Sequence, residues 1–176
     1  MKIGQNVEIE AKKLLQKLKV EAYPVDVEAI AQGEGIQVAV SKLEGGVSGF
    51  LHKDGDQVLI GLNSDHKISK RRFTLAHELG HYMLHLDDSE VTFIDKIPSS
   101  ASLINKRPLL DVDQKEVEAN AFAAALLMPE FLVARSLSKY MEKYGSIEDI
   151  AWRMAKDFEV SEQAMTIRLI RLKVFE

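Results

Sequence analysis

Histidine and glutamate residues in the middle of the chain have the spacing of a metal-binding motif. His77, Glu78 and His81 stand in the order His-Glu-x-x-His. On a helix, residues four apart lie about 40° from each other, so His77 and His81 can hold one metal ion from consecutive turns. Glu78 lies about 100° around from His77 and therefore flanks such an ion instead of binding it. A general base that takes a proton from water on the metal stands in this position.

The residues around this motif predict the helix that the geometry requires. Apolar side chains recur at spacings of three and four between Phe73 and Leu86, and Ser69 is a candidate N-cap. Gly80 lies inside the predicted helix, where glycine costs about 1 kcal/mol relative to alanine. We interpret Gly80 as a position whose missing side chain lets another element approach the metal site closely.

A second helix, predicted from an Asp113 cap through Leu127, offers a third metal ligand. Glu116 and Asn120 lie four residues apart and share one helical face. Glu118 lies about 160° from Asn120 and points elsewhere. Glu116 can therefore bind the ion, and Asn120 beside it can orient a ligand histidine.

The composition limits the classes of protein to which the chain could belong. Its 176 residues, 46% hydrophobic and 28% charged, are typical of one soluble domain, or of one domain with a small appendage. The net charge of -4 argues against a general attraction to nucleic acid or to an anionic membrane. Because there is no cysteine, any metal must be held by histidine and carboxylate groups. We see no apolar signal core or membrane-spanning run and expect a cytoplasmic protein.

Helices and strands are predicted upstream of the histidine motif. Residues 7–19 form an amphipathic helical pattern after Asn6, and Asp26 can cap a short helix through Ala31. Alternating or apolar runs predict three strands, at 36–40, 47–51 and 58–62. An Asp-Gly turn joins the last two strands, so we expect a small antiparallel sheet whose edge could pair with an extended peptide.

The segment between the two motif helices, residues 87–112, is predicted to be a long irregular connection. We expect it to form the rim of the cleft around the metal site. Loops of this length often carry function, so this segment is also a candidate lid.

The C-terminal part predicts three helices, at 130–144, 147–157 and 161–173, with Ser146 and Ser161 as caps of the last two. The last pair has the outline of a helix–turn–helix DNA-binding motif, except that Glu159 stands where glycine is usual in the turn. In one interpretation Arg168, Arg171 and Lys173 contact DNA phosphates. In the other, which the net charge favours, the pair packs on the core or binds a partner protein.

Two motifs together resemble those of the ImmA/IrrE family of metallopeptidases. The resemblance is strongest at residues 72–81, Arg-Phe-Thr-Leu-Ala-His-Glu-Leu-Gly-His, and residues 116–129, Glu-Val-Glu-Ala-Asn-Ala-Phe-Ala-Ala-Ala-Leu-Leu-Met-Pro. It implies a zinc-dependent endopeptidase, with His77, His81 and Glu116 as ligands and Glu78 as the base. It also implies a protein substrate, since relatives often act on a repressor with a helix-turn-helix domain.

The donor set is consistent with that implication. Three protein ligands leave the fourth tetrahedral position to water, as in catalytic zinc sites, although manganese or another divalent ion is an alternative. A donor for the developing oxyanion is also expected, and the candidates are backbone amides and the side chains of His52, Tyr82 and His85. His85 is also an alternative third ligand, but zinc peptidases with a third histidine place it six residues after the second. His85 follows His81 by four, which favours a place beside the ligands or in the packing.

We therefore predict an α+β, zincin-like fold. A small antiparallel sheet and a helical body would carry the metal site, followed by a helical, helix–turn–helix-like tail. The metallopeptidase domain would comprise residues 1–130, and residues 131–176 would form a helical extension packed on it. The leading functional hypothesis is an endopeptidase that cleaves a regulatory protein. The alternatives are a non-catalytic protein that binds a repressor or belongs to a toxin–antitoxin pair, and a DNA-binding regulator built on residues 147–173.

Overall fold

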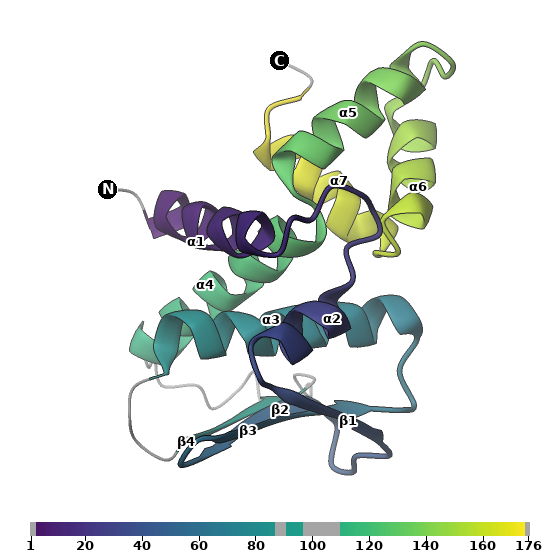
Figure 1. Cartoon of the computed structure of the whole chain (residues 1–176). Coiled ribbons are helices and arrows are strands. Elements are labelled where there is room, and N and C mark those ends of the chain that lie inside the picture. The colour runs from purple at the N-terminus through teal and green to yellow at the C-terminus, as the bar shows by residue number, and fades with distance from the viewer. Residues whose placement is uncertain (1–2, 87–90, 97–109, 175–176) are drawn as a thin grey trace.

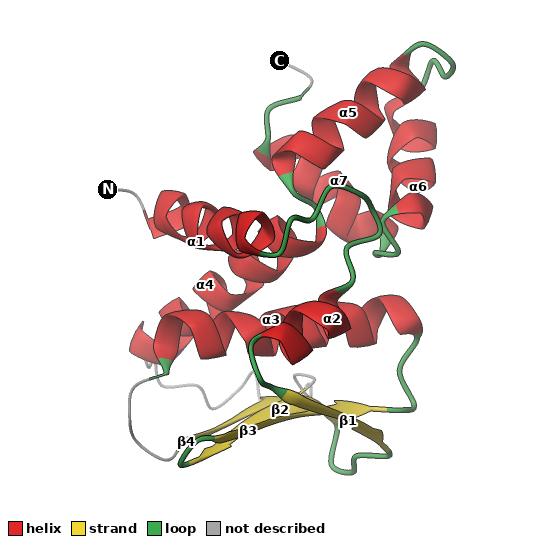
Figure 2. Cartoon of the chain, in the orientation of Figure 1, coloured by secondary structure: helices red, strands yellow, loops and turns green. Residues whose placement is uncertain are grey.

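The computed structural model describes residues 3–86, 91–96 and 110–174 and has the predicted α+β architecture. A four-stranded sheet forms one layer, and α3 (Ile68–His85) crosses its face with α2 (Val27–Gly33) alongside (Figure 1). Beyond α3 lie α4 (Leu110–Leu127) and α1 (Ile3–Lys17). The last helices, farthest from the sheet, are α5 (Glu130–Met141), α6 (Ile147–Asp157) and α7 (Glu162–Arg171). All the strands lie at one end of the molecule (Figure 2).

The sheet differs from the predicted one in two ways. Its strands are β1 (Gln37–Ser41), β2 (Val47–Asp54), β3 (Gln57–Asn63) and β4 (Val91–Lys96), in the spatial order β1-β3-β2-β4. The prediction of a wholly antiparallel sheet is wrong, because β3 lies between β1 and β2 and pairs in parallel with β1. The segment expected to be irregular contains β4, which pairs with β2. The rest of that segment up to α4 lies outside the described residues.

The packing of α3 on the sheet fixes the position of the histidine motif. The inner face of the sheet presents Leu51, Ile60 and Leu62, and α3 buries Leu75 and Leu79, each at most 2% exposed. Burying a side chain of this size contributes about 1.5–3 kcal/mol. Since the histidines share α3 with these leucines, the core that holds the helix also holds the motif.

Three side-chain caps agree with the sequence and three do not. The side chains of Asp26, Ser146 and Ser161 accept backbone N–H groups at 2.9–3.1 Å, as predicted. By contrast, α3 begins after Lys67 and α4 begins at Leu110, so Ser69 and Asp113 lie inside their helices. Helix α1 likewise starts at Ile3, before the predicted cap Asn6. A local cap signal does not exclude an earlier helix start, which neighbouring packing can support.

Long-range contacts join the C-terminal helices to the rest of the chain. The Arg168 side chain, 2% exposed, forms an ion pair with Glu8 of α1 and donates from Nε to the Met128 carbonyl at 2.9 Å. Glu159 has a φ of 52° in the turn before α7, the left-handed conformation that glycine usually supplies. Within the described part of the chain, no single helix is long and apolar enough to cross a membrane, although α4 and α5, bent by 52°, together meet those criteria.

Candidate metal centre

Three side chains from two helices bring possible metal-binding atoms together. His77 and His81, one turn apart on α3, are both buried, and their Nε2 atoms lie 3.0 Å apart. Glu116 of α4 faces both rings, with Oε2 3.3 Å from His77 Nε2 and Oε1 3.2 Å from His81 Nε2. The possible ligand atoms all lie within 4.8 Å of one another, so these residues could hold one metal ion.

The spacing of these atoms fits a small divalent ion. Tetrahedral ligands about 2.0–2.1 Å from a zinc ion are separated by about 3.3–3.4 Å, close to the separations observed here. Burial lowers the pKa of His81, and the adjacent imidazole rings of His77 and His81 hold the pKa of Glu116 far below its usual range. Neutral imidazoles beside a carboxylate are the protonation states that metal binding requires. The Glu116 side chain is 44% exposed, so the cluster is open to solvent on that side.

Glu78 follows the first histidine and is completely buried. Neither of its carboxylate oxygens has a hydrogen-bond partner among the described residues. Burial raises the pKa of Glu78 to about 9, with further contributions from the charges of Asp95 and Glu116. A divalent ion nearby would act in the opposite direction and favour the carboxylate. An unpartnered buried carboxyl group of this kind is typical of functional sites.

Hydrogen bonds on the far side of the two imidazole rings determine which nitrogen faces the cluster. His77 Nδ1 lies 3.1 Å from Asn120 Oδ1, to which it can only donate. Its Nε2 then carries the free lone pair. The His81 ring is held differently, because its Nδ1 lies 3.1 Å from Nδ1 of His85.

Glu118 completes the arrangement around His81. Its Oε2 lies 3.0 Å from His85 Nε2, and this hydrogen bond lowers the pKa of Glu118. A neutral His85 that donates from Nε2 has an acceptor at Nδ1, so His81 donates from Nδ1 and directs its Nε2 lone pair toward Glu116. Both histidines therefore present the same nitrogen to the cluster.

Gly80 and Phe93 restrict the positions of the neighbouring helix and of the His81 ring. An added Cβ at Gly80 would lie 3.0 Å from Ala119 Cα and 3.1 Å from Ala119 O, so the interpretation that Gly80 admits a neighbouring element is confirmed. That element is α4, which carries Glu116. Phe93 of β4 stacks on the His81 ring with centroids 4.6 Å apart, and thereby restricts its rotation.

The remaining candidates lie elsewhere. Tyr82 lines a separate hollow with Lys53 and Met83. The His52 ring contacts Thr92 Oγ1 at 2.9 Å across the β2–β4 pair. Sequence reasoning missed Glu118 and Phe93. The spacing of His85 four residues after His81 was the available signal for a further partner, whereas Phe93 lies in the segment predicted to be irregular.

Comparison with known proteins agrees with this geometry. The model of the peptidase M78 family, described as the IrrE N-terminal-like domain, matches residues 31–169. The chain belongs to this family. The match begins within α2 and ends within α7, so it contains both motif helices and most of the C-terminal helices.

Two curated relatives share part of this family region. One is the uncharacterized immunity region protein 2 of Bacillus phage phi105, 33% identical over 105 residues, which are 60% of this chain and 57% of that protein. Another is the radiation response metalloprotease IrrE of Deinococcus radiodurans, 33% identical over 108 residues, 61% of this chain and 29% of that protein. The chain thus spans little more than half of one relative and less than a third of the other.

Proposed function

We propose that this chain is a zinc-dependent endopeptidase that hydrolyses peptide bonds in a regulatory protein, most specifically a helix-turn-helix repressor. The observation that carries the proposal is the buried, unpartnered Glu78 carboxyl group next to the His77, His81 and Glu116 cluster. Membership of a peptidase family and the likeness to a relative named as a metalloprotease support the reaction class. The repressor substrate rests on the motif resemblance alone.

In this proposal His77, His81 and Glu116 hold the ion. Zinc is the first choice for two imidazoles and a carboxylate, with manganese or another divalent ion as the alternative. When bound, such an ion acidifies water and polarises a peptide carbonyl. Asn120 and His85 keep the two ligand rings in the required tautomer through their Nδ1 contacts.

Glu78 has the role of the general base. Its burial beside the cluster excludes competing hydrogen bonds, so its carboxylate is available to accept a proton from the attacking water and to deliver it to the leaving amine. Glu116 cannot fill that role while it holds the ion, because its two oxygens face the histidine pair.

The proposal also covers the domain organisation of the chain, its cellular location and its relation to DNA. We treat residues 1–130 as the metallopeptidase domain and residues 131–176 as a helical extension that packs on it, consistent with the Arg168 contacts to Glu8 and Met128. We propose a cytoplasmic location, where a repressor would be accessible. DNA binding through α7 is disfavoured, because Arg168, one of its three expected phosphate contacts, is buried in an ion pair.

The test compares new protein N-termini in source cells carrying the native chain, Glu78→Gln, or Glu142→Gln as a matched surface control, with and without stress. We expect a few termini, including one in a repressor, that appear with the native chain and the control but not with Glu78→Gln. The purified Glu78→Gln protein should still bind Zn²⁺. If Glu78→Gln relieves repression as well as the native chain does, the peptidase mechanism is wrong and a non-catalytic binding protein takes its place.

A further inference from the structure

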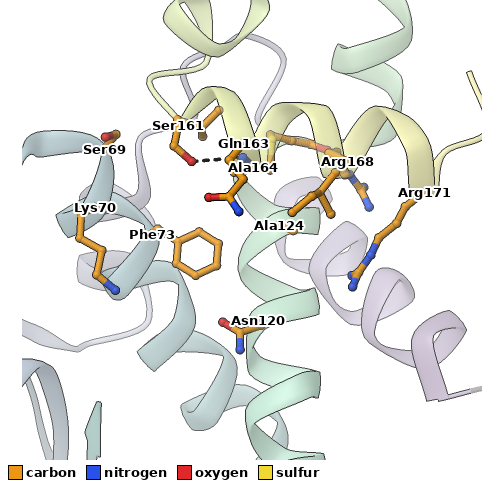
Figure 3. Close-up of a pocket in the computed structure, with 13 residues that line it drawn as sticks. Ser69, Lys70, Phe73, Asn120, Ala124, Ser161, Gln163, Ala164, Arg168 and Arg171 are labelled. Atoms are coloured by element: carbon orange, nitrogen blue, oxygen red, sulfur yellow. Dashed lines mark hydrogen bonds between the residues drawn. The ribbon is translucent and has the colours of Figure 1, made fainter. Parts of the chain in front are cut away.

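A pocket of about 340 Å³ opens between α3, α4 and α7 (Figure 3). Its apolar lining comes from Phe73 of α3, Ala124 of α4, Met128 just after α4, and Ala164 and Ile167 of α7. The Phe73 ring points from α3 toward α4, and α7 lies above them in this view (Figure 3). The volume lies at the lower end of the range for pockets that bind small molecules or side chains.

Asn120 links the pocket to one of the histidines of the metal cluster. This residue lines the pocket and contacts His77 Nδ1 at 3.1 Å. Phe73 precedes His77 by four residues, which corresponds to about 6 Å along a helix. An extended peptide covers that distance in about two residues. A peptide held at the cluster and running along α3 toward Phe73 would therefore place a side chain two residues away at the level of the pocket.

The charges around the pocket are all of one sign. Lys70, Arg168 and Arg171 line it, and none of its described lining residues is acidic, although the whole chain has a net charge of -4. Arg168 is committed to Glu8 and the Met128 carbonyl, which leaves the interior apolar. Lys70 and Arg171 lie on opposite sides of the pocket (Figure 3). Among the described residues, the Lys70 side chain forms a long ion pair, 3.8 Å, with Asp95.

We propose that this pocket selects the substrate by receiving an apolar side chain about two residues from the cleaved bond, next to an acidic residue that pairs with Arg171. The inference rests on the proposed peptidase function and adds the class of sequence that the site accepts. The apolar floor and the cationic rim are complementary to such a segment, and a basic segment would be repelled by both Lys70 and Arg171.

The experiment measures peptide binding separately from cleavage. A displayed library of random peptides is selected on the immobilised, Zn²⁺-loaded Glu78→Gln protein, which retains the pocket. The enriched peptides are then measured against three further variants in the same background. Ala124→Trp fills the pocket, and Arg171→Glu reverses its rim charge at an exposed position. Lys143→Glu is the matched charge reversal, at an exposed position in the turn after α5.

We expect enriched peptides with a large apolar residue next to Asp or Glu. Ala124→Trp and Arg171→Glu should each weaken their binding by about tenfold or more, while Lys143→Glu should leave it unchanged. Selection repeated on the Arg171→Glu protein should enrich Lys or Arg in place of the acid. This change in the selected residue tests the proposal even if the Ala124→Trp protein fails to fold.

The proposal is overturned if no peptide is enriched over the bare support, or if binding is insensitive to both pocket variants. Cleavage is scored separately, by incubating the enriched peptides with the native chain and Zn²⁺. If binding depends on the pocket but the native chain cleaves none of the enriched peptides, the proposed peptidase function is wrong, and the pocket remains a peptide-binding site. If the native chain cleaves peptides whose binding is unchanged by both pocket variants, the proposed role of the pocket is wrong and the peptidase function is supported.

Discussion

His85 Nε2 lies 3.0 Å from Glu118 Oε2, while Glu116, two residues before Glu118, faces the His77–His81 pair. Helix α4 thus supplies one carboxylate to the metal cluster and another to the hydrogen-bond chain behind it. Glu118 was expected to point elsewhere, but its side chain meets the next histidine along α3. The two carboxylates consequently have different roles on the same row of imidazoles.

Removal of the Glu118 carboxylate should weaken metal binding. In Glu118→Ala, nothing fixes the His85 tautomer that accepts from His81 Nδ1, so the His81 lone pair is less well directed. We expect zinc affinity to fall by about 10–100-fold, measured by competition with a chelating dye. Gln114→Ala is the matched control, because Gln114 contacts the other Glu118 oxygen and not His85. Equal affinities for Glu118→Ala and the native chain would show that the contact is only structural.

Asn120 should support His77 through its acceptor atom alone. Asn120→Ala removes the group that accepts from His77 Nδ1, and we expect a loss of zinc affinity of about 10–100-fold. Asn120→Asp keeps an acceptor at the same position and should restore most of the affinity. The same dye competition distinguishes the two variants, and an equal loss in both would contradict the assigned hydrogen bond.

A side chain at Gly80 should force α3 and α4 apart. Because the nearest atoms to an added Cβ belong to the Ala119 backbone, they cannot move aside as a flexible side chain could. We expect Gly80→Leu to reduce the free energy of unfolding by about 1–3 kcal/mol, measured by urea denaturation, and to weaken zinc binding. Gly145→Leu is the control, since an added Cβ there meets nothing within 4 Å. A Gly80→Leu protein with native stability and zinc affinity would contradict the close approach.

The ion pair between α1 and α7 should stabilise the fold more than a surface pair does. In Glu8→Ala, the buried Arg168 guanidinium loses its carboxylate, and we expect a loss of about 1–3 kcal/mol in thermal or urea unfolding. The pair between Glu10 and Lys13 is exposed, so Glu10→Ala should cost about 0–1 kcal/mol. Similar values for the two variants would mean that the Glu8 contact contributes little.

The sequence by itself determined the local chemistry of this protein. Residues four apart on a helix share one face, so His77 lies beside His81 and Glu116 beside Asn120 independently of the tertiary fold. The α+β class and the family also followed from short segments, because periodicity and motifs are local properties. Cap signals were less decisive, since Asp26 caps its helix but Ser69 and Asp113 do not.

Only the tertiary structure decided the relationships between distant segments. Pattern alone specifies which face of a strand is buried but not which strand lies beside it, so the parallel β1–β3 pair and the position of β4 depended on three-dimensional packing. The contact of Glu118 with His85 likewise depends on how α3 crosses α4 at Gly80. The sequence left open whether Arg168 contacts DNA phosphates or packs on the core, whereas in the structure it is buried and paired with Glu8, 160 residues earlier.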